Sequence, residues 1–383
     1  MKYSTFFFVS GLLLLLAACV QPSAALSDTL KGDTATQPIE FQATMLVPSI
    51  TSTITHTPTA TATLTPIPTA TRTALPPTPT PTIPTVTTFI ADELSPIVTP
   101  VGYLADTCDY LENRWGRGKS EPGTIVVPIM FHSIAKPGRV ISDATTISTE
   151  YFEFFMAYAE ELGFSTITMD ELVGFLTENE KIPERSMLLI LDDRRPGVTE
   201  LFMPYLEAND WTLTLAWPTT EGTNDELWAR MESLAESGRL DVQSHGHDHI
   251  YIQDYTPLEE IEEEIYRPIE VIQTHFGTTP SAIIWPGGNF NEVAIQLAKE
   301  AGLRFGFTVY SRGPLMFNWI PLGEAEMEMD APLYVLPRYW STAADVALNQ
   351  AVAISEAAKQ AANGVKADEL YYLEHYCPAI KRD

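Results

Sequence analysis

A short apolar run that ends in charged residues constrains the fold of this chain most. Every residue from Met187 to Leu191 is apolar, and Asp192 and Asp193 follow at once. A strand without polar and apolar alternation is buried on both faces, which is typical of a parallel sheet. Because α/β folds place their chemistry at the carboxyl ends of such strands, the two aspartates form a candidate site. The alternative is a solvated turn that closes a strand.

From about residue 101 onward, strand patterns alternate with helix patterns. Further strands are predicted at 124–132, 211–217, 239–244, 281–285, 304–309 and 333–336. Helices are predicted at 148–162, 169–176, 198–207, 225–237, 258–276, 291–301 and 342–362. Strands that alternate with helices form right-handed βαβ units. About seven strands over this length suit a closed barrel better than a small open sheet.

The amino terminus has the layout of a secretory signal. Lys2 precedes an apolar stretch from Phe6 to Leu16, and small residues follow before Cys19. The stretch is too short for a comfortable transmembrane span. The order Leu-Ala-Ala-Cys resembles the lipobox of bacterial lipoproteins, which implies a signal peptide at 1–18 and a lipid on Cys19. Such a lipid would anchor the chain to the outer surface of a membrane, outside the cytoplasm; the alternative is an ordinary signal peptide with a chance cysteine.

The next segment is rich in threonine and proline. Thr-Pro repeats recur in it, as in Leu75 to Thr82. Such a composition cannot bury a core and favours an extended spacer. We therefore predict a disordered linker at 19–100, followed by one folded domain at 101–383.

Charge and cysteine content narrow the setting of that domain. The net charge of −27 argues against nucleic-acid binding, which needs basic patches. Besides Cys19, the chain has only Cys108 and Cys377, near the two ends of the predicted domain. An oxidising compartment permits a disulfide, and the ends of a domain are often close. We predict a Cys108–Cys377 disulfide, with two unpaired thiols as the alternative.

A histidine cluster follows the strand predicted at 239–244. His245 and His249 are four residues apart and share one face if the loop takes a helical turn, whereas His247 points away. This cluster and the aspartate pair open on the same face of a parallel barrel. Two imidazoles and one carboxylate bind a divalent metal and leave positions open, which is typical of a catalytic site.

The two aspartates are expected to divide the work. Adjacent strand residues point to opposite sides, so Asp192 and Asp193 reach one point only if the strand ends there. The Arg-Arg-Pro-Gly sequence that follows indicates such an end. One carboxylate would bind the metal, and the other would serve as general base for water activated by the metal.

These residues resemble the motifs of the polysaccharide deacetylases, the chitooligosaccharide-deacetylase type of carbohydrate esterase. Leu191-Asp192-Asp193 is similar to T-F-D-D-G, and Ser244-His245-x-x-x-His249 is similar to S-H-[ST]-x-x-H. Val127 to Ser133 resembles the V-P-x-L-x-Y-H opening, and Trp285 to Gly288 resembles Y-P-x-G. The resemblance covers roughly residues 124–339.

The resemblance implies an α/β fold, a distorted (β/α)7 TIM-like barrel. It implies Asp192 as general base and Asp193, His245 and His249 as ligands of a divalent metal, usually zinc. The implied reaction is the hydrolysis of acetyl groups, above all N-acetyl groups, on a cell-surface or environmental polysaccharide.

Several positions depart from the family pattern. Arg194 replaces the usual glycine, and the arginine of the third motif and the later Leu-x-His motif are absent. We hypothesise that Arg338 orients Asp192 and that His132 is the catalytic acid; the alternatives are a plain ion pair and a polar strand cap. A degenerate barrel that binds glycans without cleaving them is therefore the second reading. A glycosidase with two carboxyl groups is a third.

Four more residues near strand patterns have two readings each. Trp217, Trp285 and Trp340 would form stacking walls for sugar rings or would pack in the core. Asp241 would support a histidine ligand or lie at the edge of its strand.

Overall fold

The computed structural model describes residues 88–220 and 224–377. The predicted signal peptide, the cysteine predicted to carry a lipid and most of the predicted linker lie outside the described residues. None of the helices in the described part of the chain is long and apolar enough to cross a membrane.

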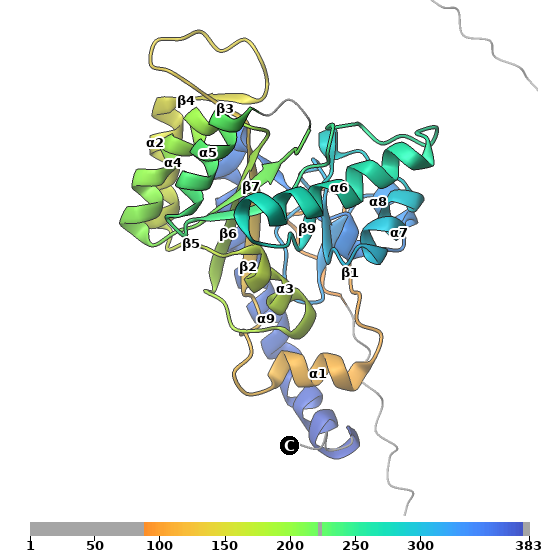
Figure 1. Ribbon diagram of the computed structural model, residues 1–383. Helices are drawn as coiled ribbons and strands as arrows, with labels where there is room; N and C mark the ends of the chain where they lie inside the picture. Colours follow the sequence, from red (N-terminus) through yellow and green to blue (C-terminus); the bar gives the residue numbers. More distant parts are fainter. Residues whose placement is uncertain (1–87, 221–223, 378–383) are drawn as a thin grey trace, which may run out of the picture. The chain divides into compact units, whose positions relative to one another are not determined.

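A parallel sheet forms the centre of the described domain (Figure 1). Its main path runs in the order β10, β9, β8, β7, β6, β2, β12, and β5 (Ser165–Thr166) pairs beside β6. Its strands are β2 (Ile125–Phe131), β6 (Arg185–Asp192), β7 (Leu213–Trp217), β8 (Leu240–Ser244), β9 (Ala282–Ile284), β10 (Phe305–Phe307) and β12 (Tyr339–Trp340).

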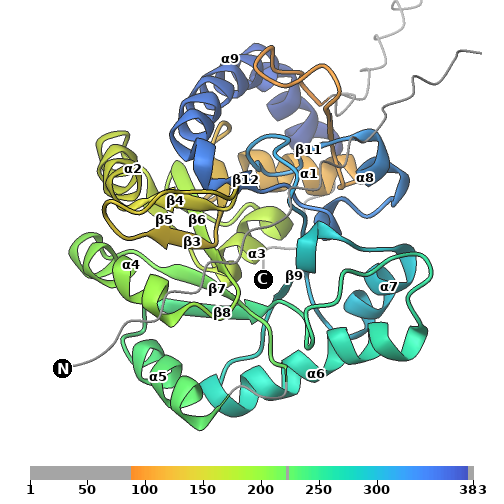
Figure 2. The same cartoon turned by 90° about the horizontal axis from the view of Figure 1, so that it is seen from above.

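The two ends of this sheet are joined, which closes it into a barrel. Leu336 pairs in parallel with Phe307 of β10, and its backbone N–H donates to the Gly306 carbonyl at 2.8 Å. A few residues later, β12 pairs with β2. The segment 336–340 therefore connects β10 to β2, and the view from above shows the ring (Figure 2). The predicted distorted (β/α)7 barrel is confirmed.

Helices surround the barrel, mostly close to the predicted ranges, although the last helix continues to Tyr376, well beyond its predicted end at residue 362. They are α2 (Thr149–Glu161), α3 (Met169–Glu178), α4 (Pro196–Asn209), α5 (Asp225–Ala235), α6 (Leu258–Phe276), α7 (Glu292–Glu300) and α9 (Ala344–Tyr376). The smaller elements are a parallel pair, β3 (Ser133–Ala135) and β4 (Thr146–Ser148), and α8 (Glu324–Glu328). The predicted strand at 333–336 is wrong, because Pro332 begins a 3-10 turn and the closing strand comes after it.

Both faces of β6 are buried, as the apolar run predicted. Met187, Leu189 and Leu191 join one apolar cluster, with residues of α2, α4 and α9. Leu188 and Ile190 join the other, with residues of α3, α6 and α7. Burial on both faces holds the strand firmly and presents its carboxyl end as a rigid support for the aspartates.

The folded domain begins earlier than predicted. Phe89 stacks on Trp319 with ring centroids 5.3 Å apart, and β1 (Thr99–Val101) pairs with β11 (Ile320–Leu322). Three apolar residues between them are buried in the core, namely Ala91, Leu94 and Val98. The predicted end of the 19–100 linker is therefore wrong. Prolines and threonines surround these apolar residues in the sequence, so the composition of the segment did not indicate that they are buried.

The predicted Cys108–Cys377 disulfide is confirmed. Cys108 lies on α1 (Thr107–Trp115) and Cys377 follows α9, with their Cα atoms 5.5 Å apart. The bond joins the element that precedes the barrel to the last helix.

Candidate metal site

Three barrel strands deliver ionisable side chains to one place. His132 directly follows β2, Asp192 is the last residue of β6, and His245 directly follows β8. Because these strands are parallel, their carboxyl ends lie at the same end of the barrel.

Asp193, His245 and His249 form the candidate metal site. The two histidine Nε2 atoms are 3.1 Å apart, and Asp193 Oδ1 lies 3.4 Å from His249 Nε2 and 3.9 Å from His245 Nε2. Zinc holds nitrogen and oxygen ligands at about 2.0–2.2 Å, so two ligands of one ion lie up to ~4 Å apart. The three ligand atoms therefore fit one divalent ion.

The chemical state of His245 also fits a metal ligand. Its Nδ1 lies 2.6 Å from the Ile284 carbonyl oxygen, which only accepts hydrogen bonds, so Nδ1 carries the proton. The lone pair of Nε2 then faces the other two ligands. Burial lowers the pKa of His245 to about 4, so the ring is neutral at neutral pH, as metal binding requires.

Left-handed backbone conformations turn the ligands toward one another. Asp193 has φ 69°, which reverses the chain directly after β6 and brings both aspartates to within about 4 Å of His245 Nε2. Gly246 and His249 have φ 76° and 60°. The loop 245–249 does not take the helical turn under which the two imidazoles would share one face; glycine permits a different backbone path that still joins them.

Asp192 is buried beside the metal ligands and held by an arginine. Its Oδ1 accepts a hydrogen bond from Arg338 Nη1 at 2.6 Å, and Arg338 Nε donates to the Thr308 carbonyl at 2.8 Å. Burial by itself raises the pKa of Asp192, but Arg338 and then His245 and His132 lower it below its ordinary value. Asp192 is therefore ionised at neutral pH.

His132 faces the other oxygen of Asp192. Its Nε2 lies 3.6 Å from Asp192 Oδ2, and its ring stacks on Trp340 with centroids 5.9 Å apart. Burial lowers the pKa of His132. The structure thus brings every predicted site residue together at one end of the barrel.

Sequence reasoning missed Arg195. Its Nη2 and Nε donate to Asp193 Oδ2 at 2.7 and 3.2 Å, and its Nη1 donates to Ser133 Oγ at 2.7 Å. This contact occupies one oxygen of Asp193 and leaves Oδ1 toward the histidines. The Arg-Arg pair after the aspartates was the available signal, but spacing alone does not show that Arg195 contacts Asp193 and Ser133.

An open pocket adjoins the site. It has a volume of about 370 Å³ and is lined by Asp193, Arg194, Arg195, Pro218, Thr220, Asp248 and His249. It gives a substrate direct access to two of the three candidate ligands.

Other predictions near the site are corrected. Trp217 and Trp285 are fully buried in the core, so they form no sugar-stacking walls, whereas Trp340 is partly exposed. Asp241 accepts hydrogen bonds from Met169 N and Gln243 Nε2 and supports no histidine. It lies near the start of β8, at the opposite end of the barrel. His247 contacts Thr219 Oγ1 at 2.9 Å and stays outside the ligand set.

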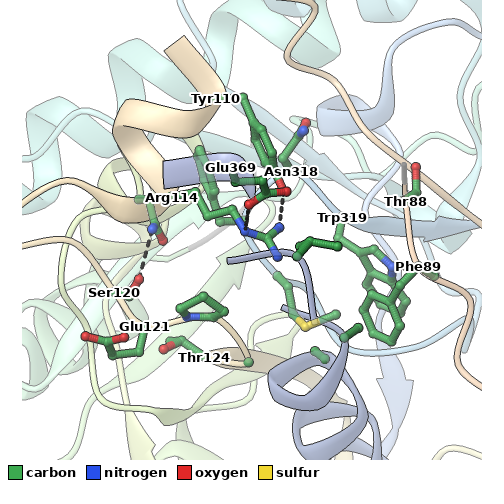
Figure 3. A pocket seen from close by; sticks show the side chains of 18 of the residues that line it. Thr88, Phe89, Tyr110, Arg114, Ser120, Glu121, Thr124, Asn318, Trp319 and Glu369 are labelled. Carbon is green, nitrogen blue, oxygen red and sulfur yellow. Dashed lines mark hydrogen bonds and ion pairs between the residues drawn. The ribbon is translucent and has the colours of Figure 1, made fainter. Parts of the chain in front are cut away.

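A larger cavity of about 620 Å³ lies at the amino-terminal end of β2, between α1 and α9 (Figure 3). Its polar groups serve the fold: Arg114 Nε lies 3.1 Å from Glu369 Oε2, and Asn318 Oδ1 accepts two backbone N–H groups. Among the described residues, the only cluster of three or more potential metal ligands is the one at the other end of the barrel.

Comparison with known proteins points to one family. The family model for polysaccharide deacetylases matches residues 179–306, which contain both aspartates and both ligand histidines. YxkH of Bacillus subtilis (strain 168), whose assignment as a polysaccharide deacetylase is itself an inference, is 24% identical over 195 residues. The poly-β-1,6-N-acetyl-D-glucosamine N-deacetylase of Escherichia coli (strain K12) is 22% identical over 231 residues.

These relatives are covered only in part. The match spans 50% of this chain and 66% of YxkH, and 48% of this chain and 34% of the Escherichia coli enzyme. Among solved structures, the Streptococcus pyogenes deacetylase PplD in complex with acetate has a TM-score of 0.49 and 18% identity, and the match covers 60% of this chain and 99% of that chain. Within this chain, residues 179–306 therefore form the segment that matches the polysaccharide deacetylase family model.

Proposed function

We propose that this protein is a zinc-dependent hydrolase that removes acetyl groups, above all N-acetyl groups, from a polysaccharide outside the cytoplasm. One observation carries the proposal. Two imidazole nitrogens and a carboxylate oxygen converge within 3.9 Å of one another, beside a second carboxylate held by a buried arginine.

Asp193, His245 and His249 would hold the metal. Nitrogen and oxygen donors in this number, with positions left open, favour zinc in a catalytic role. A divalent metal held there supplies Lewis-acid chemistry, which polarises a carbonyl group and makes water a stronger nucleophile.

Asp192 would act as general base. Because Arg338 occupies only Oδ1, Oδ2 is turned toward His132 and His245 and is available to take the proton of the attacking water. His132 lies close enough to Asp192 to pass that proton on to the departing amine nitrogen. The acetyl carbon–nitrogen bond then breaks, and the products are acetate and a free amine.

The substrate class rests on two supports. The Escherichia coli relative is named for an acetylated amino-sugar polymer. Trp340, stacked on His132 and partly exposed, offers an aromatic face beside the reacting groups, and such faces suit sugar rings.

The proposed location rests on the amino terminus and the disulfide. A disulfide between Cys108 and Cys377 persists in an oxidising compartment. The signal layout before Cys19 supports lipid attachment to the membrane surface, with the Thr/Pro-rich segment as a spacer.

The test measures metal content and acetate release from N-acetylglucosamine oligomers, for the wild type and two variants. We expect the wild type to bind zinc and release acetate, and His245→Ala to lose both. Asp192→Asn should keep the zinc but lose acetate release by about 10²–10⁴-fold, the usual contribution of a general base. His275→Ala is the matched control, since His275 lies on α6 next to Glu232 and outside the site.

Two results would contradict the proposal. Zinc binding without acetate release from any acetylated glycan would favour a barrel that binds glycans without cleaving them. A wild-type protein without bound metal would remove the basis of the mechanism.

A further inference from the structure

Glu264 is a buried carboxylate on α6 that the proposed reaction does not use. It is only 1% exposed, and both of its oxygens accept backbone hydrogen bonds. Asp248 N donates to Oε1 at 2.6 Å, and His247 N donates to Oε2 at 3.1 Å. A buried carboxylate is costly unless it is hydrogen-bonded, so these two contacts and a further backbone hydrogen bond from Ile250 account for its presence there.

The first two of these donors belong to the loop between the two histidine ligands. The backbone of this loop is irregular, with left-handed conformations at Gly246 and His249, and it lacks the regular hydrogen bonds of a helix or strand. Glu264 supplies bonds to two successive amides in its middle. The first two residues of the loop also bond to β7 and the segment after it: His245 N donates to the Trp217 carbonyl at 3.2 Å, and Thr219 N donates to the Gly246 carbonyl at 3.2 Å.

Gly246 shows how closely the loop and Glu264 are fitted. A Cβ atom on Gly246 would lie 2.0 Å from Glu264 Oε2, a distance that real Cβ atoms do not adopt. The glycine is therefore required both by its positive φ of 76° and by the approach of the carboxylate.

We propose that Glu264 is a positioning residue for the metal site. By fixing the two loop amides, its carboxylate brings His249 Nε2 to 3.1 Å from His245 Nε2 before any metal binds. Groups that orient metal ligands in this way determine how tightly the metal is held. The inference rests on the proposed metal-dependent function.

The test compares zinc affinity, measured by competition with a chromogenic chelator, in the full chain and its variants. Glu264→Gln keeps the side-chain shape but turns an NH2 group toward a backbone N–H. Gly246→Ala leaves the carboxylate chemically unchanged but displaces it, and it also strains the loop backbone at a positive φ. Glu262→Gln is the matched control, because it makes the same substitution at an exposed position on the same helix.

We expect Glu264→Gln and Gly246→Ala to weaken zinc binding by about 10- to 100-fold, as is usual for residues that orient ligands. Glu262→Gln should keep the wild-type affinity. The visible spectrum of bound Co²⁺ should change in the first two variants and stay unchanged in the control. A purely structural role would lower the melting temperature of the metal-free protein without changing that spectrum.

The outcomes separate this inference from the proposed function. A folded Glu264→Gln protein with wild-type zinc affinity overturns the inference and leaves the function standing. If that variant fails to fold, wild-type affinity in Gly246→Ala has the same meaning. A wild-type protein that binds no zinc overturns the proposed function, and the inference with it.

Discussion

The two ends of the barrel each contain an arginine–carboxylate pair, in opposite surroundings. At the carboxyl end, Arg338 and Asp192 are 2.6 Å apart with side chains 0% and 3% exposed. At the amino end, Arg114 and Glu369 are 3.1 Å apart with side chains 22% and 10% exposed. Glu369 Oε2 also accepts a hydrogen bond from Trp115 Nε1 at 2.7 Å.

The two carboxylates differ in whether an oxygen remains available for a further partner. Asp192 keeps one oxygen turned toward two imidazoles, whereas the Arg114-bound oxygen of Glu369 is already shared with a second donor. The amino end also holds the disulfide and the larger cavity, yet its polar groups are used for structure. In this molecule the convergence of incompletely paired ionisable groups, rather than cavity size, marks the candidate site.

The largest expected effect on stability comes from Arg338→Met. The change leaves the Asp192 carboxylate buried without its cation, which costs about 3–5 kcal/mol of unfolding free energy. Urea denaturation of the metal-free protein measures the loss. If the loss is smaller than the loss caused by replacing Cys108 and Cys377 with serine, the Arg338–Asp192 pair is not the largest contributor to stability among the interactions compared.

The same variant gives a prediction for pH. In the wild type, Arg338 opposes burial and the pKa of Asp192 is lowered, so Asp192 contributes stability that is lost only as pH falls through that lowered pKa. Without Arg338, burial raises the pKa, and the variant loses stability as pH rises. The gap between the two proteins should therefore shrink from neutral pH toward pH 4. A constant gap in urea denaturation would contradict this.

The next effect concerns the amino end. Replacing Cys108 and Cys377 together by serine should lower the unfolding free energy by about 2–4 kcal/mol, because the bond closes a long loop in the unfolded chain. Zinc affinity and acetate release should remain those of the wild type, since the bond lies at the opposite end of the barrel. A parallel loss of zinc binding would show that the two ends are coupled.

The smallest effect is expected for Arg114→Met, the matched counterpart of Arg338→Met. Its pair is partly exposed, and Glu369 retains the Trp115 donor, so the loss should be about 1 kcal/mol or less. Urea denaturation under the same conditions measures it. A loss of unfolding free energy equal to that of Arg338→Met would show that the two arginine–carboxylate pairs contribute equally to stability.

Much of this protein follows from residue patterns alone. The unbroken apolar run before Asp192 predicted a strand buried on both faces, because a strand without polar positions has no face for water. The alternation of strands and helices predicted the barrel, and the spacing of Asp193, His245 and His249 singled out side chains that do meet. These features depend on local periodicity and on short motifs, which a sequence displays directly.

The tertiary structure alone decided how the groups are paired. Arg195 turns to Asp193, Glu264 reaches the histidine loop from α6, and Trp217 lies in the core. It also decided that residues 88–100 belong to the folded domain. Such contacts join residues far apart in the chain or residues that meet at a tight turn. They depend on backbone turns such as the left-handed Asp193, which local patterns do not specify.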